Sequence, residues 1–203
     1  MSKPGSMQRQ GGRVARFLNV LLAIVIVLLI VQNYQLKQKL PSPPPKPDIV
    51  ALGERLPDLR LKNTQGQQVN IDFSDQSAAS FTLLYILTTQ CRACQETIPT
   101  WRKLDVKMRS QGLQSYFVVV NEGEDLTAYA EAKNISGKVY NPADGNTFSQ
   151  DYKVVGVPMT LLLDSQGHVQ FAHLGVLSRQ HVKEVETVLE AGCKNPSDCT
   201  ATP

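Results

Sequence analysis

The first 47 positions of this 203-residue chain contain no acidic residue, and all 18 aspartates and glutamates lie at or after position 48. The same segment carries seven of the 21 basic residues. The remainder, with 14 basic and 18 acidic side chains, is therefore net acidic. The formal charge of +3 reflects the N-terminal segment, so it does not indicate nucleic-acid binding.

Histidine and cysteine are also scarce, with three and four copies, and no histidine lies close in sequence to either cysteine pair. The spacing of Cys193 and Cys199 suits a zinc site poorly, and we expect no metal and no cofactor. We instead predict that these two form a local structural disulfide in a C-terminal tail, residues 192–203. For Cys91 and Cys94, the alternatives to redox chemistry are half of a zinc site, simple packing in the core and a structural disulfide without redox activity.

One long apolar run is present near the N-terminus. Residues 17–31 contain a single polar side chain, Asn19, and a run of this length approaches the roughly 17–20 residues that span a bilayer. We predict an anchor over 17–34, with basic residues 1–16 in the cytoplasm. A cleaved signal peptide is the competing interpretation, but no small-x-small cleavage site follows Val31. The proline-rich linker 35–47 then leads into a globular domain, 48–191, outside the cytoplasm.

The domain is organised around Cys91-Arg92-Ala93-Cys94. An apolar run at 81–87 predicts a buried strand before it, and apolar residues recurring at three- and four-residue steps predict a helix to about 110 after it. The first sulfur would then face the positive end of a helix, which stabilises a thiolate, and Arg92 adds a nearby charge. We predict Cys91 as the attacking and Cys94 as the resolving sulfur.

The remaining pattern predicts an α/β domain. A hairpin over 56–61 and 68–71 precedes the cysteines, and a strand at 115–120 and a helix at 125–133 follow them. Strands at 159–163 and 168–174 flank a turn, and a last amphipathic helix begins near Ser178. Helices alternating with parallel strands, followed by an antiparallel pair, predict a three-layer arrangement around a mixed sheet.

This order of elements resembles the thioredoxin superfamily, and most of all its membrane-anchored TlpA/ResA-like thiol-disulfide oxidoreductases. The resemblance covers about 48–191 and rests on the Cys-x-x-Cys, on Pro99 and on Gly156-Val157-Pro158. It implies that Pro158 is cis beside the disulfide and that the Val157 backbone pairs with a substrate strand. From the sequence alone a Val-Pro bond is more often trans.

Several positions depart from the family pattern. Gln90 stands where a tryptophan usually precedes the first cysteine, and Ala93 where many members have proline. Thr97 and Tyr85 occupy the two positions at which relatives carry a buried acid that exchanges a proton with the second cysteine. Glu96, the nearest acid, is expected to face solvent. The group that would serve Cys94 is therefore not visible in the sequence.

The resemblance implies an inner-membrane thiol-disulfide oxidoreductase with its domain in the periplasm. It would reduce client proteins during cytochrome c or other redox-protein maturation, and a membrane donor of the DsbD/CcdA type would reset it. A MauD-like role with one client is the runner-up. A redox-inactive adaptor and a peroxiredoxin-like peroxidase stay as alternatives. Thr88 stands three residues before Cys91, as in peroxiredoxins. The proline expected four residues before that threonine is absent, and Leu84 stands in its place.

Overall fold

The computed structural model describes residues 11–39, 47–73 and 81–192. The chain divides into two compact units, residues 1–46 and 47–203, which are described separately. The first unit contains α1 (Gly11–Lys39). Its stretch Ala15–Gln35 has a mean hydropathy of 2.5 and no buried residue, so it is long and apolar enough to cross a membrane. Residues 1–10 and 40–46, part of the predicted N-terminus and linker, lie outside the described residues.

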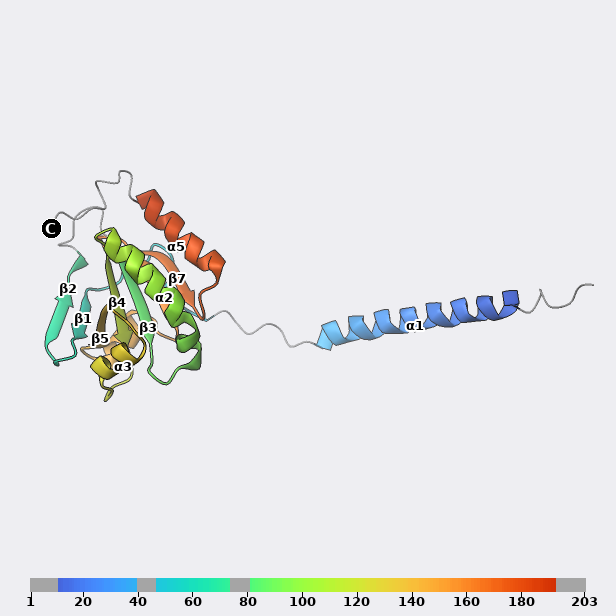
Figure 1. Ribbon diagram of the computed structural model, residues 1–203. Coiled ribbons are helices and arrows are strands. Elements are labelled where there is room, and N and C mark those ends of the chain that lie inside the picture. The colour runs from blue at the N-terminus through green and yellow to red at the C-terminus, as the bar shows by residue number, and fades with distance from the viewer. Residues whose placement is uncertain (1–10, 40–46, 74–80, 193–203) are drawn as a thin grey trace, which may run out of the picture. The chain divides into compact units, whose positions relative to one another are not determined.

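The second unit is a thioredoxin-like α/β domain, as the sequence predicts. Its elements are β1 (Leu59–Lys62), β2 (Gln68–Ile71), β3 (Thr82–Leu87), α2 (Arg92–Ser110), β4 (Gln114–Val119), α3 (Leu126–Ala132), β5 (Lys138–Pro142), α4 (Gly145–Asp151), β6 (Met159–Leu163), β7 (Val169–Leu174) and α5 (Arg179–Gly192). The strands form one mixed sheet in the order β2-β1-β5-β4-β3-β6-β7. Figure 1 shows α2 and α5 over the sheet, with the N-terminal hairpin at one edge.

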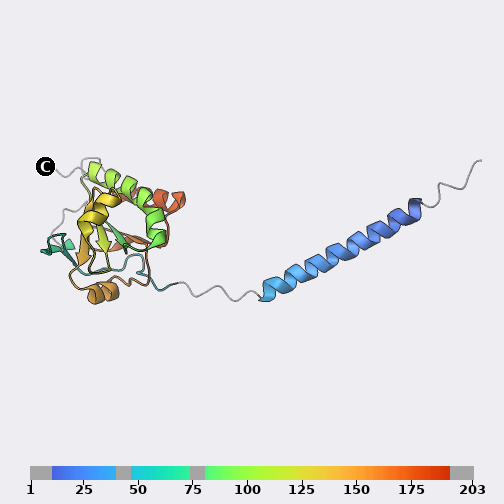
Figure 2. The same ribbon diagram turned by 60° about the horizontal axis from the view of Figure 1, so that its bottom comes forward.

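The sheet is covered on both faces, which gives the three layers. Residues of α2, α3 and α5 share one buried cluster with alternate residues of β3 and β4. The intervening strand residues form a second cluster with Phe148 of α4, Tyr152 and the segment around Val50 and Leu56. Figure 2 shows α4 on the opposite side of the sheet from α2 and α5. Burial on both faces explains why every residue of β3 is apolar or fully buried.

Strand pairing follows the predicted pattern. Strands β3 and β4 pair in parallel, as expected for two strands joined by a helix. The hairpin β6–β7 is antiparallel, with a register shift between Leu162 and Leu163. The N-terminal hairpin β1–β2 is also antiparallel, and its first strand begins at Leu59, three residues later than predicted. Figure 1 shows α2 in front of β3 and β4, in the middle of this sheet.

Two elements were missing from the sequence prediction. Strand β5 pairs in parallel with β4 and antiparallel with β1, so it joins the hairpin to the rest of the sheet. Helix α4 follows it, with Asp144 capping its N-terminus by accepting from the Thr147 N–H. Three of the five residues of β5 are partly or fully accessible and the two buried ones do not alternate with them, and α4 is only seven residues long. Neither segment therefore shows a strong period.

Candidate active site

The two cysteines of the Cys-x-x-Cys stretch are joined by a disulfide, and their Cα atoms lie 5.2 Å apart. Cys91 is the N-cap of α2, in extended conformation after the turn that leaves β3. Its Sγ accepts a hydrogen bond from the Cys94 N–H at 3.0 Å. An N–H donor and the positive end of a helix both favour negative charge on that sulfur. The local geometry is therefore suited to a Cys91 thiolate once the bond is reduced.

The two sulfurs differ in access. Cys94 is completely buried against the core, whereas Cys91 is partly exposed. Attack on or by a thiol requires contact with the sulfur, so a protein partner can reach Cys91 alone. This asymmetry matches the division of roles expected from the sequence, with Cys91 as attacking and Cys94 as resolving sulfur. The roles themselves are taken up below as proposals.

The Val157–Pro158 peptide bond is cis and lies beside the disulfide. The Val157 carbonyl oxygen is 3.9 Å from the Cys91 Sγ. The Pro158 carbonyl accepts from the Gly175 N–H at 2.7 Å, which fixes the other side of this loop. Cys91 and Val157 thus lie side by side although 66 residues separate them.

A buried side-chain hydrogen bond ties α2 to the strand that follows the cis proline. The Trp101 indole N–H donates to the Thr160 hydroxyl at 2.9 Å, and both residues are fully buried. Trp101 lies on α2 two turns beyond Cys94, and Thr160 lies on β6 two residues beyond Pro158. This contact therefore holds the cysteine helix and the cis-proline strand in one arrangement. Tyr85 and Phe117 pack against the same indole.

Arg92 points away from the core. Its side chain is 95% exposed, and its Nε lies 3.8 Å from the Glu96 carboxylate, one turn along the same helix. Glu96 is itself exposed, as predicted. Water screens an exposed charge, and the glutamate partly compensates it. Arg92 is thus placed to contribute little to the charge of the Cys91 sulfur.

The two positions at which relatives carry a buried acid hold no acid here. Thr97 is fully buried, and its hydroxyl accepts from the Leu177 N–H at 3.3 Å. Tyr85 is fully buried, and its hydroxyl has no hydrogen-bond partner among the described residues. Burial, with a smaller effect of Asp105, raises the pKa of Tyr85 well above its ordinary value. Tyr85 therefore stays protonated and cannot accept a proton from Cys94.

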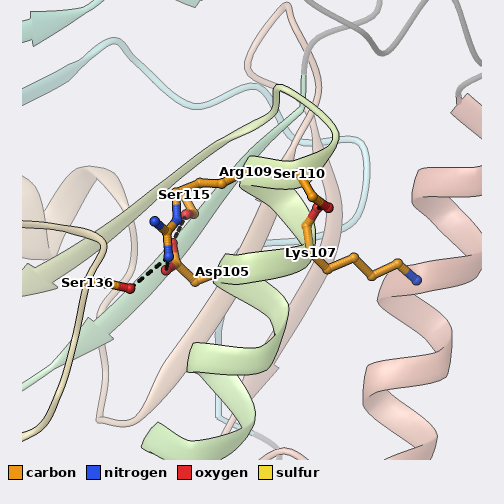
Figure 3. Close-up of polar contacts among 6 residues, drawn as sticks. All are labelled: Asp105, Lys107, Arg109, Ser110, Ser115 and Ser136. Carbon is orange, nitrogen blue, oxygen red and sulfur yellow. Dashed lines mark hydrogen bonds and ion pairs between the residues drawn. The ribbon is translucent and has the colours of Figure 1, made fainter.

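The structure does reveal a buried acid that the sequence analysis missed. Asp105 is 1% exposed on α2, where it accepts from the Ser115 hydroxyl and pairs with Arg109 at 2.8 Å. Figure 3 shows this cluster, in which Arg109 also donates to Ser136. Asp105 lies eleven residues beyond Cys94, about 16 Å along the helix at 1.5 Å per residue. It joins α2 to β4 and is too distant to serve the cysteines.

Figure 3 also shows Lys107, whose side chain leaves α2 on the opposite side from this cluster, toward α5. Its ammonium pairs with Glu186 of that helix at 2.9 Å. The two contacts fix the C-terminal half of α2 from both flanks. Asp105 and Arg109 are four residues apart on one helix, and this spacing alone could have predicted their ion pair.

The histidines lie apart from the cysteines in sequence and have other partners. His168 lies 3.4 Å from Asp164 in the β6–β7 turn. The rings of His173 and His181 are 3.7 Å apart between β7 and α5. Burial, and next the neighbouring His181, lower the pKa of His173. Among the described residues, no three His, Cys, Asp or Glu side chains come together as a metal site.

Cys193 and Cys199 lie outside the described residues, so their predicted disulfide stays a prediction. For the described part of the chain, the disulfide at a helix N-terminus, the cis proline beside it and the single accessible sulfur form one site. Such an arrangement can exchange a disulfide with a partner thiol or disulfide pair.

Comparison with known proteins agrees with this chemistry. The sequence model of the AhpC/TSA family matches residues 52–172. The thioredoxin-like protein YneN of Bacillus subtilis (strain 168) is 22% identical over 135 residues, which are 65% of this chain and 76% of YneN.

Solved structures show the same fold. The thioredoxin domain of a Bacteroides vulgatus thiol-disulfide oxidoreductase is 20% identical, with a TM-score of 0.60, and the match covers 70% of this chain and 99% of that one. A Chlorobium tepidum protein described as the thiol:disulfide interchange protein DsbE is 23% identical, with a TM-score of 0.57 and coverages of 69% and 99%. The predicted thioredoxin-like fold is confirmed, and the relatives support the predicted thiol-disulfide oxidoreductase.

Proposed function

Since this chain belongs to the AhpC/TSA family, whose model matches residues 52–172, we propose that it is a membrane-anchored thiol-disulfide oxidoreductase acting outside the cytoplasm. Its Cys91–Cys94 pair would exchange electrons with the cysteines of client proteins. One observation carries the proposal: the only accessible sulfur of the pair is the one that caps α2, accepts the Cys94 N–H and faces the cis-proline loop.

In the reducing direction the reaction starts from the dithiol. The Cys91 thiolate attacks one sulfur of a client disulfide, which forms a Cys91–client bond and releases the other client sulfur as a thiolate that takes up a proton. Cys94 loses its proton and attacks the Cys91 sulfur, which re-forms Cys91–Cys94 and releases the second client thiol. Two electrons pass from the pair to the client. The structure holds the oxidised state with which this sequence ends.

We propose supporting roles for the neighbouring residues. The Val157 backbone and Pro158 would hold the client strand beside Cys91, because the Val157 carbonyl is 3.9 Å from the sulfur. Arg92 would favour the Cys91 thiolate by its positive charge, but only weakly, given its 95% exposure. No cofactor is required, since both electrons are carried by the two sulfurs.

The place of the reaction follows from α1. We propose that residues 17–34 anchor the chain in the inner membrane, with the N-terminus cytoplasmic and the thioredoxin-like domain periplasmic. The apolar stretch of 21 residues supports the anchor, and the basic residues before it support the orientation. An oxidising compartment does not restore a dithiol, so a reductase there needs a membrane electron donor, for which we propose the DsbD/CcdA type.

The clients would be proteins whose thiols must be reduced before a cofactor is attached, as in cytochrome c maturation. The Chlorobium relative described as a disulfide interchange protein supports disulfide exchange as the chemistry of this role. Dedicated service to one redox protein, as for MauD-like proteins, is the narrower form of the same proposal.

The test is turnover by the full chain in detergent micelles on a disulfide-bonded protein substrate with a dithiol reductant. Cys91→Ser should abolish turnover, and Cys94→Ser should accumulate a mixed disulfide with the substrate. The double variant Cys193→Ser, Cys199→Ser removes the other two cysteines and should keep full turnover. Equal turnover by wild type and Cys91→Ser would instead support an adaptor without redox activity.

The direction of electron flow is read from the Cys91–Cys94 reduction potential. A value well below about −200 mV indicates a reductase, while one near −120 mV indicates an oxidant. A peroxide-consumption assay with a sulfenate trap separates the peroxidase alternative: rapid trapping at Cys91 and fast peroxide turnover would favour it over disulfide exchange.

A further inference from the structure

The turn that delivers Cys91 to the tip of α2 is held by a side chain from another strand. Asn121 follows β4, and its amide makes two hydrogen bonds to Thr89, two residues before Cys91. The Asn121 Oδ1 accepts from the Thr89 N–H at 3.0 Å, and its Nδ2 donates to the Thr89 hydroxyl at 2.8 Å. The two residues are 32 positions apart, so this is a tertiary contact between the ends of β3 and β4.

This contact bears on the sulfur through a short stretch of backbone. The Cys91 N–H donates to the Thr88 carbonyl at 3.3 Å, which closes the turn on the residue next to Thr89. Cys91 then places its Sγ 3.0 Å from the Cys94 N–H and 3.9 Å from the Val157 carbonyl. Both of those distances depend on where the turn sets the Cys91 Cα. Fixing Thr89 at both its N–H and its hydroxyl therefore fixes the cysteine.

Asn121 is itself well anchored. Its Nδ2 also donates to the Glu124 carboxylate at 3.3 Å. Its backbone carbonyl accepts from the side-chain amide of Asn141 on β5 at 3.2 Å. Next to it, the Val120 N–H donates to the Leu87 carbonyl at 2.9 Å, which continues the β3–β4 pairing up to the turn. These hydrogen bonds hold the backbone and the side chain of Asn121 in the position from which its amide contacts Thr89.

We propose that Asn121 is a positioning residue for disulfide exchange, which acts through Thr89 to hold Cys91 against the helix N-terminus. The inference rests on the proposed function, because it assigns Asn121 a part in that reaction. A capped Cys91 thiolate needs the Cys94 N–H in line with its sulfur, and an amide that makes both bonds to Thr89 limits the freedom of the turn. Asparagine suits this position because it offers a donor and an acceptor on one short side chain.

The consequence appears in the reduced protein. Without Asn121 the turn would sample positions in which Cys91 leaves the Cys94 N–H, so the pKa of its thiol would rise. A less stabilised thiolate shifts the equilibrium toward the disulfide. A tenfold shift in that equilibrium would lower the reduction potential by about 30 mV. We expect a shift of about this size and a turnover loss of about tenfold in Asn121→Ala.

The experiment follows the alkylation rate of Cys91 against pH in the reduced full chain, in detergent micelles, together with the reduction potential. Asn121→Ala should move the alkylation profile to higher pH and lower the potential. Thr89→Val, which removes the hydroxyl but keeps the N–H, should move both by less, and Thr89→Ser, which keeps the hydroxyl, should match wild type. A difference between Thr89→Val and Thr89→Ser would follow the hydroxyl that Asn121 contacts, which a general loss of stability would not do.

Asn63→Ala is the matched control. The Asn63 side chain holds the β1–β2 turn in the same way, accepting from the Gln65 and Gln67 N–H groups at 2.9 Å. It should leave the Cys91 profile and the potential unchanged. An unchanged profile in Asn121→Ala, or an equal change in Asn63→Ala, would overturn the inference. If Asn121→Ala does not fold, the Thr89→Val and Thr89→Ser pair decides it.

The outcome is separable from that of the proposed function. Alkylation and potential report on the Cys91 environment even if the chain turns over no protein disulfide. A wild type inactive in turnover but with an Asn121-dependent alkylation profile would remove the proposed function and keep the positioning role of Asn121 for the cysteine.

Discussion

Substitutions of Trp101 and Thr160 should have coupled effects on the free energy of unfolding, because the two side chains share a buried hydrogen bond. This bond joins the cysteine helix to the cis-proline strand. Trp101→Phe removes the indole N–H and leaves the Thr160 hydroxyl buried without a partner. Leaving a buried polar group unpaired costs about 1–3 kcal/mol. The smaller ring adds a packing loss, so we expect about 2–4 kcal/mol in all, below the ~3–5 typical of Trp→Ala.

Thr160→Val is the complementary change, since valine has the same shape without the hydroxyl. It leaves the indole N–H unpaired and should cost about 1–3 kcal/mol. In the double variant neither group remains to be satisfied, so the loss should fall short of the sum by about 1–2 kcal/mol. A domain of ordinary stability, about 5–15 kcal/mol, should tolerate all three variants.

Urea unfolding of the oxidised full chain in detergent, followed by far-ultraviolet circular dichroism, measures these differences, because Trp101 is the single tryptophan and fluorescence is lost with it. Equal slopes against urea for wild type and the three variants would show that the comparison is sound. Strict additivity of the two single changes would refute the reasoning, since it would mean that the hydrogen bond contributes nothing that depends on both partners. The double variant should also keep some turnover, because the Cys91 cap is intact.

Two further predictions concern other parts of the domain. Gly137→Ala should destabilise the fold by about 1–3 kcal/mol in thermal unfolding, because the new Cβ would lie 2.9 Å from the Asp105 carboxylate. Gly145→Ala is the control: its new Cβ would lie 4.0 Å from the nearest atom, the Val120 carbonyl oxygen, so it should be neutral or stabilising. Burial and the adjacent His181 lower the pKa of His173, so the folded state binds fewer protons than the unfolded state, whose histidine titrates near 6.5. Stability should therefore be full above about pH 6.5 and decline as pH falls toward the lower folded value, and His173→Gln should flatten that decline; an unchanged slope would contradict it.

The sequence predicts the elements whose signal is local. The apolar run of β3, the three- and four-residue steps of α2 and the Asp164–Gly167 turn each identify their element within a short window. The same holds for α5, which is amphipathic as predicted, with the buried residues Val185 and Leu189 four positions apart on one face. The strand–turn–helix around the cysteines is of this kind, so the candidate site could be placed before its geometry was known.

The parts that could not be predicted depend on distant partners. Strand β5 is defined by pairing with β4 and β1 on either side, and its own sequence has no alternation that marks it. Asp105 could not be recognised as buried until Ser115 was brought next to it from β4. The same applies to Asn121 and Thr89, which are polar residues after two strands and become a pair only when the strands align.

The burial of Cys94 has a kinetic consequence under the proposed function. Every partner that exchanges electrons with the Cys91–Cys94 pair must form its bond at Cys91, because Cys91 is the accessible sulfur of the two. The Cys91 sulfur can form a mixed disulfide with only one partner at a time, so the client and the electron donor must react one after the other. Steady-state rates measured against both should then give the parallel reciprocal lines of a ping-pong scheme, and each species should compete with the other when present in excess.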